Sequence, residues 1–229
     1  MQVRGKDLIN NEIMQPNKSE DYKFSKNCRD GFGSYWHQVN EALVEGVNSV
    51  LVIGQGDNIV PFILKSQGLA VDTFDIVKDM NPTYVGSVLD IGEIVKRKYD
   101  CILCCEVLEH LPLDKLEKIV SQFNDIATQK IIISLPIFGL AGYIKIWAPK
   151  YINFTFVIRV PYYKLGHKVM CKEHYWELNS KYVKRKDVDE IFERNFKVLN
   201  AYRVKDTPYH MFYILEPKVD KLHLIGEKS

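Results

Sequence analysis

The stretch SVLVIGQGDNIVPFILKSQ, residues 49–67, decides the fold. It opens with a continuous apolar run, residues 49–54, as expected for a strand that is covered on both faces. Gly54 and Gly56 follow, and a helical pattern over residues 58–67 comes next, with Pro61 in its first turn and Gly68 after its end. Either Asp57 or Asn58 can cap this helix. A buried strand, a glycine turn and a helix together predict the first unit of an open α/β sheet.

The same alternation continues along the chain. Further strands are predicted at 69–76, 83–91, 99–106 and 130–136, with helices at 32–47 and 112–127. The tail adds a helix at 184–195 and two strand-like runs, 196–204 and 209–217, around the turn-prone KDTP. We therefore predict an α/β fold: a doubly wound, Rossmann-like sheet of seven strands, mostly parallel, with a C-terminal antiparallel hairpin.

Length and composition place this fold in one domain. The 229 residues read as a polar N-terminal arm over 1–30 and a single domain over 31–229, with an aromatic and basic insertion at about 137–170. A net charge of +2 does not favour nucleic acid as the main partner. Three cysteines in one predicted strand (Cys101, Cys104 and Cys105) read as small buried residues of a reducing compartment. With no apolar leader and no long apolar run, the expected location is the cytoplasm.

The glycine turn and the end of the next strand form a predicted ligand site. Gly54 and Gly56 let a ligand approach the backbone closely, and Asp75 lies at the end of the second strand, where it can accept hydrogen bonds from a ribose diol. An adenosine-containing ligand is expected. NAD is disfavoured, because its fingerprint needs a third glycine where this chain has Ile59.

Four segments resemble the motifs of class I S-adenosylmethionine-dependent methyltransferases: VLVIGQGDN, TFDI, GSVLDI and YDCILCCEVLEHLP. The resemblance covers residues 35 to 136 and implies S-adenosylmethionine as cofactor. It implies that Gly54, Gln55 and Gly56 line the methionine and ribose, that Asp75 holds the ribose hydroxyls, and that Asp90 and Ile91 face the adenine. The remaining cofactor contacts that it implies are Asp57, Ile76 and Glu106.

Two positions depart from the pattern of that family. Val52 stands where its first motif commonly has an acid, and Asn58 stands where it has a third glycine. Asparagine tolerates a left-handed backbone better than most residues, so the turn is expected to survive.

The stretch CCEVLEHLPL, residues 104–113, carries the candidate chemistry. If a helical turn begins after Cys105, then Glu106, Glu109 and His110 share one face of it. Three interpretations stay open. The residues cap a helix and bond the backbone; His110 is a general base for a substrate hydroxyl; or the group binds a divalent metal ion.

The metal interpretation rests on a second resemblance. The spacing E-x-x-E-H is similar to that of small-RNA 2′-O-methyltransferases of the Hen type and of ubiquinone-pathway O-methyltransferases, which implies a divalent ion such as Mg²⁺ or Mn²⁺. The segment KEHYWELN resembles the one that supplies a further ligand, here His174. The candidate metal ligands are thus Glu106, Glu109, His110 and His174, and the candidate catalytic residues are Glu106, His110 and His174. His210 is expected to be a packing residue of the terminal hairpin.

The tail is also similar to that of uncharacterised bacterial methyltransferases associated with cell-surface polysaccharide gene clusters. Taken together, these resemblances imply an enzyme that methylates a hydroxyl on a sugar, a glycan or a small molecule. The alternatives are an RNA 2′-O-methyltransferase and a noncatalytic adenosine-binding protein. The insertion at 137–170 is expected to form a lid over the acceptor or a peripheral contact with a membrane.

Overall fold

The computed structural model describes residues 31–139, 141–148, 150–159, 173–205 and 207–218. The predicted N-terminal arm, 1–30, lies outside these residues, as does the 160–170 part of the predicted insertion. Within the described chain, no helix is long and apolar enough to cross a membrane.

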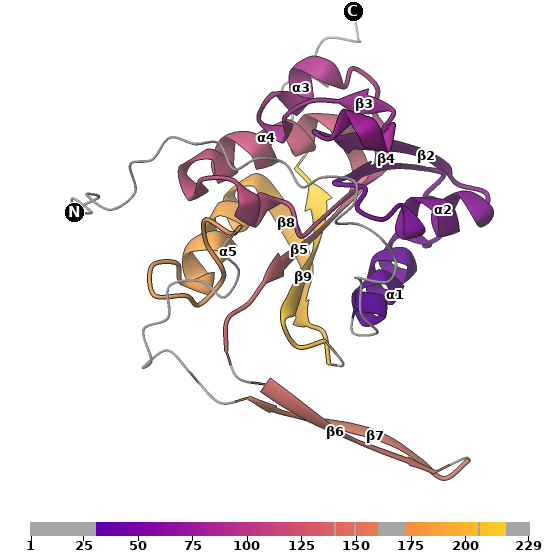
Figure 1. Cartoon of the computed structure of the whole chain (residues 1–229), viewed down its shortest axis with the longest axis vertical. Helices are drawn as coiled ribbons and strands as arrows, with labels where there is room; N and C mark the ends of the chain where they lie inside the picture. Colours follow the sequence, from indigo (N-terminus) through magenta and orange to yellow (C-terminus); the bar gives the residue numbers. More distant parts are fainter. Residues whose placement is uncertain (1–30, 140, 149, 160–172, 206, 219–229) are drawn as a thin grey trace, which may run out of the picture.

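A seven-stranded sheet forms the body of the protein, with the strand order β3-β2-β1-β4-β5-β9-β8 (Figure 1). Its strands are β1 (Ser49–Ile53), β2 (Ala70–Asp75), β3 (Tyr84–Val85), β4 (Tyr99–Cys105), β5 (Ala127–Pro136), β8 (Phe196–Arg203) and β9 (His210–Pro217). The first five run parallel, and β9 pairs antiparallel with both β5 and β8. The predicted fold class, including the C-terminal antiparallel hairpin, is confirmed.

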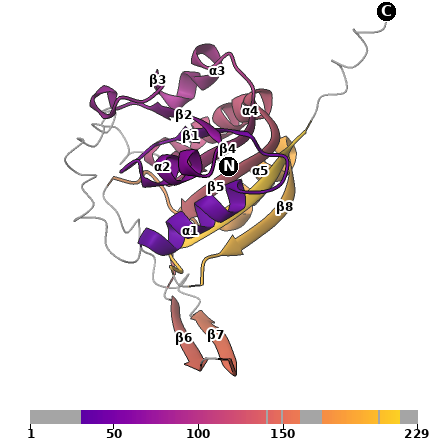
Figure 2. The same ribbon diagram turned by 90° about the vertical axis from the view of Figure 1, so that its right-hand side faces the viewer.

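Helices cover both faces of the sheet (Figures 1 and 2). One face packs on α1 (Gly31–Ala42) and α2 (Ile59–Ser66), and the other on α3 (Ile91–Ile94), α4 (Leu116–Ile126) and α5 (Arg185–Asn195). Alternate residues of β1 serve the two layers: Val50 and Val52 belong to the first core, and Leu51 and Ile53 to the second. This double burial explains why β1 is apolar throughout.

Cys101 and Cys104 of β4 are fully buried on opposite faces of the sheet, as predicted for small core residues. Burial raises the pKa of the Cys101 thiol to about 12. Because the thiolate is the reactive form, this side chain is inert near neutral pH.

The third strand is much shorter than predicted. Residues 83–91 read as one strand, but only Tyr84–Val85 pair with β2, and a 3-10 helix, Val88–Asp90, leads directly into α3. The Ser87 hydroxyl accepts a hydrogen bond from the Leu89 backbone N–H and so caps that helix. The apolar residues after Gly86 therefore pack as short helical turns.

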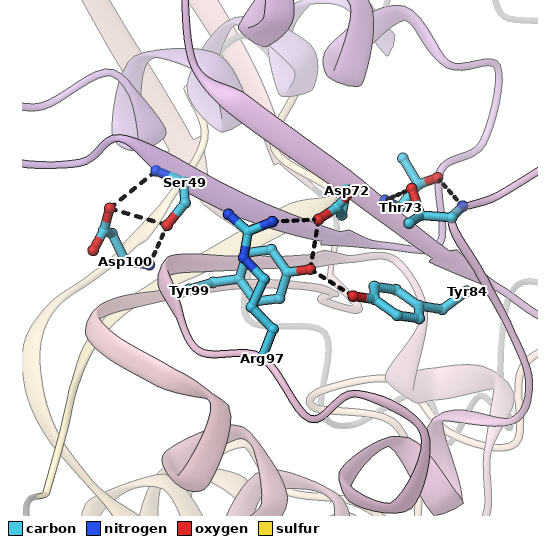
Figure 3. Close-up of polar contacts among 8 residues, drawn as sticks. Ser49, Asp72, Thr73, Tyr84, Arg97, Tyr99 and Asp100 are labelled. Carbon is cyan, nitrogen blue, oxygen red and sulfur yellow. Dashed lines mark hydrogen bonds and ion pairs between the residues drawn. The ribbon is translucent and has the colours of Figure 1, made fainter.

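Polar contacts tie the outer strands to the centre of the sheet (Figure 3). The Asp72 carboxylate in β2 accepts hydrogen bonds from the Tyr99 hydroxyl at 2.7 Å and from the Arg97 guanidinium at 3.1 Å, and the Tyr84 hydroxyl lies 3.2 Å from that of Tyr99. At the start of β1, Asp100 accepts hydrogen bonds from the backbone N–H and the hydroxyl of Ser49. These contacts satisfy buried hydroxyls and leave the carboxyl ends of the strands for a ligand.

The remaining strands form a separate two-stranded sheet. β6 (Ala141–Ala148) and β7 (Ile152–Arg159) pair antiparallel inside the predicted insertion. In both views this hairpin extends away from the body of the molecule (Figures 1 and 2).

Candidate active site

The turn between β1 and α2 holds three left-handed residues. Gly54 has φ 73°, Gly56 has φ 54° and Asn58, the first residue before α2, has φ 65° and ψ 10°. The expectation that asparagine preserves this turn is confirmed. A Cβ on Gly54 would lie 2.4 Å from Cγ2 of Val107, whereas one on Gly56 would meet no atom within 4 Å. The backbone at Gly54 is therefore packed against the end of β4, and that at Gly56 faces open space.

Asp75 fixes the glycine turn to the end of β2. Its Oδ2 accepts a hydrogen bond from the Gln55 backbone N–H at 3.0 Å, and its Oδ1 accepts one from the Val77 N–H at 2.9 Å. A carboxylate can accept about four hydrogen bonds, so acceptor positions remain for a ribose diol. The next residue, Ile76, has an exposed side chain, which a residue that packs on a ligand ring needs.

Two other predicted cofactor residues serve the protein itself. The Gln55 side chain donates a hydrogen bond to the Met80 carbonyl, so only the backbone of Gln55 contributes to the turn. Asp57 accepts hydrogen bonds from the Tyr35 hydroxyl at 2.7 Å and from the Ile59 N–H at 3.1 Å, which ties α1 to the start of α2.

The two predicted adenine contacts, Asp90 and Ile91, differ in exposure. Asp90 is exposed and lies 3.6 Å from the Lys118 ammonium. Ile91 is fully buried in the core, packed as the first residue of α3. The predicted contact of Ile91 with the cofactor is therefore open to its backbone and not to its side chain, which packs in the core.

The chain after β4 does not form the helical turn that the sequence predicted. Glu106 has a left-handed backbone, φ 54°, and a 3-10 helix forms only over Leu108–His110. Glu106 therefore lies outside this helical turn, and the predicted single helical face is not formed. The Glu106 N–H donates to the Ser134 carbonyl at 3.1 Å, which extends the β4–β5 pairing by one hydrogen bond.

Glu106 binds residues of β5 and β9. Its Oε1 accepts a hydrogen bond from the Ser134 hydroxyl at 2.8 Å and lies 3.1 Å from Nδ1 of His210. Burial alone would raise the pKa of Glu106, but the His210 charge and these hydrogen bonds lower it. The pKa of His210 is raised: burial would lower it, but the Glu106 carboxylate outweighs burial. His210 lies in the terminal hairpin, as predicted, and its contact with Glu106 is an addition that the sequence did not predict.

Glu109 is the buried acid of the site. Its side chain has no exposed surface, and neither carboxylate oxygen has a hydrogen-bond partner among the described residues. Burial and the nearby Glu106 charge raise its pKa well above the usual range. An unsatisfied buried carboxyl is costly unless a proton or a cation neutralises it. This group is thus suited to receive a positive charge.

Two histidines face this carboxyl. His174 Nε2 lies 4.0 Å from Glu109 Oε1, and the ring centroids of His110 and His174 are 4.9 Å apart. Backbone contacts bring His174 here: the Tyr175 N–H donates to the Glu109 carbonyl at 2.8 Å, and the Trp176 indole N–H donates to the Leu111 carbonyl at 2.9 Å.

Both imidazoles are oriented through their Nδ1 atoms. His110 Nδ1 donates to the Glu173 carbonyl and His174 Nδ1 to the Glu177 carboxylate, each at 3.0 Å. Because these partners only accept, the neutral form of each ring has its lone pair on Nε2. Burial and the neighbouring His174 lower the pKa of His110, so its neutral form dominates near pH 7. Neutral imidazoles with a free Nε2 can bind a metal ion or accept a proton.

Three of the four predicted metal ligands lie together, and the fourth, Glu106, has other partners. Potential ligand atoms of Glu109, His110 and His174 all lie within 4.8 Å of one another, while Glu106 belongs to the Ser134–His210 pair. Sequence reasoning missed Tyr209, whose hydroxyl donates to Glu177 at 3.0 Å. Burial and Glu177 raise the pKa of Tyr209, so it stays a hydrogen-bond donor.

Only the comparison with solved structures finds proteins that are similar to this chain. No family model matches the sequence, and no curated protein matches it. Among solved structures, magnesium protoporphyrin IX methyltransferase from Synechocystis with bound SAH is similar, with a TM-score of 0.55 and 15% identity over 90% of this chain and 91% of that one. A SAM-dependent methyltransferase from Archaeoglobus fulgidus has a TM-score of 0.54 and 14% identity over 86% and 97%.

A third similar structure is the small RNA methyltransferase HEN1, with a TM-score of 0.53 and 12% identity over 83% of this chain and 25% of that one. The chain has the class I fold of SAM-dependent methyltransferases.

Proposed function

We propose that this protein is an S-adenosylmethionine-dependent O-methyltransferase that acts on a hydroxyl of a sugar, a glycan or another small molecule. One observation carries the proposal: the glycine turn touches the start of the acid–histidine cluster, since Gly54 packs directly against Val107. A cofactor held over the turn would have its reacting end beside Glu109, His110 and His174. A methyl donor and a group that accepts a proton are both needed at that place.

The cofactor would contribute a methyl group already activated on a sulfonium. The chain's own part is to hold the ribose at Asp75, to admit the backbone-bound end over Gly54 and Gly56, and to orient the acceptor hydroxyl. As the new carbon–oxygen bond forms and the carbon–sulfur bond breaks, the hydroxyl proton must leave. In this proposal Nε2 of His110 or His174 takes the proton, and Glu177 holds the His174 ring through Nδ1.

The three-residue group also fits a divalent ion. Glu109 offers a carboxylate that lacks any hydrogen bond, and both imidazoles present an Nε2 whose opposite nitrogen is already fixed by an acceptor. Such carboxylate- or carbonyl-oriented histidines are typical of metal ligands. One carboxylate and two imidazoles suit Mn²⁺, Fe²⁺ or Zn²⁺ better than Mg²⁺, which prefers oxygen ligands. A bound ion would lower the pKa of the acceptor hydroxyl.

The sugar, glycan or small-molecule acceptor is supported by the balanced charge of the chain, +2 overall. RNA is the rival acceptor, and HEN1 shows that this fold occurs in an RNA methyltransferase. A noncatalytic adenosine-binding protein is the other rival. It is motivated by Val52, which is buried in β1 at the position where the first motif of the resembling family commonly has an acid.

Transfer of a labelled methyl group from S-adenosylmethionine to panels of sugars, glycans and short RNAs tests the proposal. We expect incorporation into a hydroxyl-bearing small molecule or glycan, dependent on His110 and His174. Incorporation into RNA alone would replace the acceptor class. Binding of S-adenosylmethionine without transfer to any acceptor would favour the noncatalytic protein.

A further inference from the structure

The hairpin of β6 and β7 has one face made only of apolar residues. The register places Ile144 opposite Phe156 and Ile146 opposite Phe154, with Gly142 opposite Ile158 and Ala148 opposite Ile152. All pairs on this face are apolar, because side chains alternate between the two faces of a strand. The large ones are Ile144, Ile146, Ile152, Phe154, Phe156 and Ile158, each about half exposed. We call these six residues the apolar face.

The opposite face of the hairpin is mixed. It pairs Lys145 with Thr155, Trp147 with Asn153, Tyr143 with Val157 and Ala141 with Arg159. The hairpin therefore has one uniformly apolar face and one face that mixes polar and apolar residues. Nothing in the described part of the chain pairs with either strand except the other strand of the hairpin.

The tip of the hairpin carries exposed aromatic and basic side chains. Trp147 is 66% exposed and Tyr151 is 88% exposed, on either side of an exposed Lys150. Tryptophan and tyrosine combine an apolar ring with a polar atom, and they gather where a lipid bilayer meets water. The eight residues of each strand give a reach of about 25 Å from the body.

Charge selects among the possible occupants of this face. From Ile126 to Lys172 the sequence contains no Asp or Glu, while Lys145, Lys150 and Arg159 fall within the hairpin. A second copy of the chain would bring the same cations together with no carboxylate of either hairpin to compensate them. An anionic lipid surface attracts them. A two-stranded hairpin is also marginally stable in water alone, so its apolar face needs a cover.

We propose that the β6–β7 hairpin is a membrane arm, which inserts its apolar face into the interfacial layer of an anionic lipid bilayer. The arm holds the protein at the surface without crossing it, since the hairpin is a pair of strands with open edges and with Lys145, Asn153 and Thr155 on its second face. This inference does not depend on methyl transfer and concerns a surface separate from the candidate active site.

Vesicle flotation of the full chain tests the arm. The two probes are vesicles of phosphatidylglycerol with phosphatidylcholine and vesicles of phosphatidylcholine alone. We expect the protein to float with the anionic vesicles and much less with the neutral ones. Phe154→Ser with Phe156→Ser should lower the partition coefficient by at least about tenfold, because two large apolar side chains are removed from the lipid.

The matched control is Asn153→Ser with Thr155→Ser, on the opposite face of the same strand and without a change of charge. It should float like the unchanged protein. Lys145→Gln with Lys150→Gln should reduce the preference for anionic vesicles. Unchanged thermal unfolding of each variant would show that the body remains folded.

The proposal is overturned if the unchanged protein floats with neither kind of vesicle, or if the two Ser pairs lose binding equally. Light scattering supplies the competing result. A dimer that becomes monomeric in the Phe154→Ser, Phe156→Ser variant, together with absent flotation, would identify the apolar face as a contact between copies of this chain.

Discussion

The Nε2 atom of His174 lies 4.0 Å from Oε1 of Glu109, a fully buried carboxylate with no hydrogen-bond partner in the part of the chain that the structure describes. The two residues come from segments more than sixty positions apart, and the backbone contact from Tyr175 to Glu109 joins those segments. A buried acid beside a basic nitrogen is a site that gains from a shared proton or cation. The predictions begin from this pair.

The metal version of the site predicts which side chains matter for Mn²⁺. Glu109→Gln, His110→Ala and His174→Ala should each weaken Mn²⁺ binding by at least about tenfold, since each removes a ligand. Electron paramagnetic resonance of free Mn²⁺ measures the loss directly. Glu106→Gln should weaken binding less than Glu109→Gln does, because Glu106 is engaged by Ser134 and His210 and acts on the cluster through its charge.

Two results would contradict that assignment. If the unchanged protein binds neither Mn²⁺ nor Zn²⁺, the cluster acts without an ion, and proton transfer by His110 or His174 remains. If Glu106→Gln abolishes binding while Glu109→Gln does not, the ligand set derived from the geometry is wrong.

The two glycines of the turn should respond differently to alanine. Gly56→Ala places a Cβ in open space, so its cost is the left-handed backbone alone, about 1 kcal/mol of folding stability. Gly54→Ala adds a clash with Val107 and should cost at least about 2 kcal/mol. Urea unfolding of both variants measures the difference. Adding Val107→Ala to Gly54→Ala should restore part of the loss, and equal costs for the two glycines would refute the close contact.

The pair of Glu106 and His210 should make stability depend on pH. The folded pKa of His210 is raised, so its stabilising contribution is fully present below the unfolded value of about 6.5 and is lost as pH rises through the folded value. The lowered pKa of Glu106 keeps that carboxylate charged across this range. His210→Gln should therefore cost stability at pH 6 and progressively less above pH 7.

Thermal unfolding between pH 5.5 and 8.5 checks this dependence. Ser134→Ala removes a hydrogen bond to Glu106 but keeps the ion pair, so it should lower stability at every pH and leave the slope unchanged. Identical slopes in the unchanged protein and His210→Gln would show that the pair does not titrate as described.

The sequence predicts the local parts of the site well. The turn after β1 depends on residues close in the chain, and Gly54, Gly56 and Asn58 have the left-handed backbone that their types favour. Failures occur where a distant contact decides. The left-handed Glu106 is set by its pairing with Ser134 on β5, so the local helical pattern at 106–110 was overridden.

The role of His210 was also beyond local reading. It depends on β9 lying antiparallel to β5 with His210 opposite Pro136, which brings the imidazole to the end of the sheet that holds Glu106. A one-residue slip would turn it to the other face. The burial of the Ile91 side chain was not predicted either, since its place in a ligand motif gave no sign that α3 packs it into the core.

Calorimetric titration with S-adenosylhomocysteine tests the central claim, a cofactor site over the glycine turn, most directly. We predict one site per chain. Asp75→Ala should weaken binding by about 1 to 3 kcal/mol, because it removes an acceptor for the ribose and releases the Gln55 and Val77 amides. Asp114→Ala, an exposed acid far from the turn in sequence, should bind normally. The absence of binding to both S-adenosylhomocysteine and S-adenosylmethionine by the folded, unchanged protein would contradict the account.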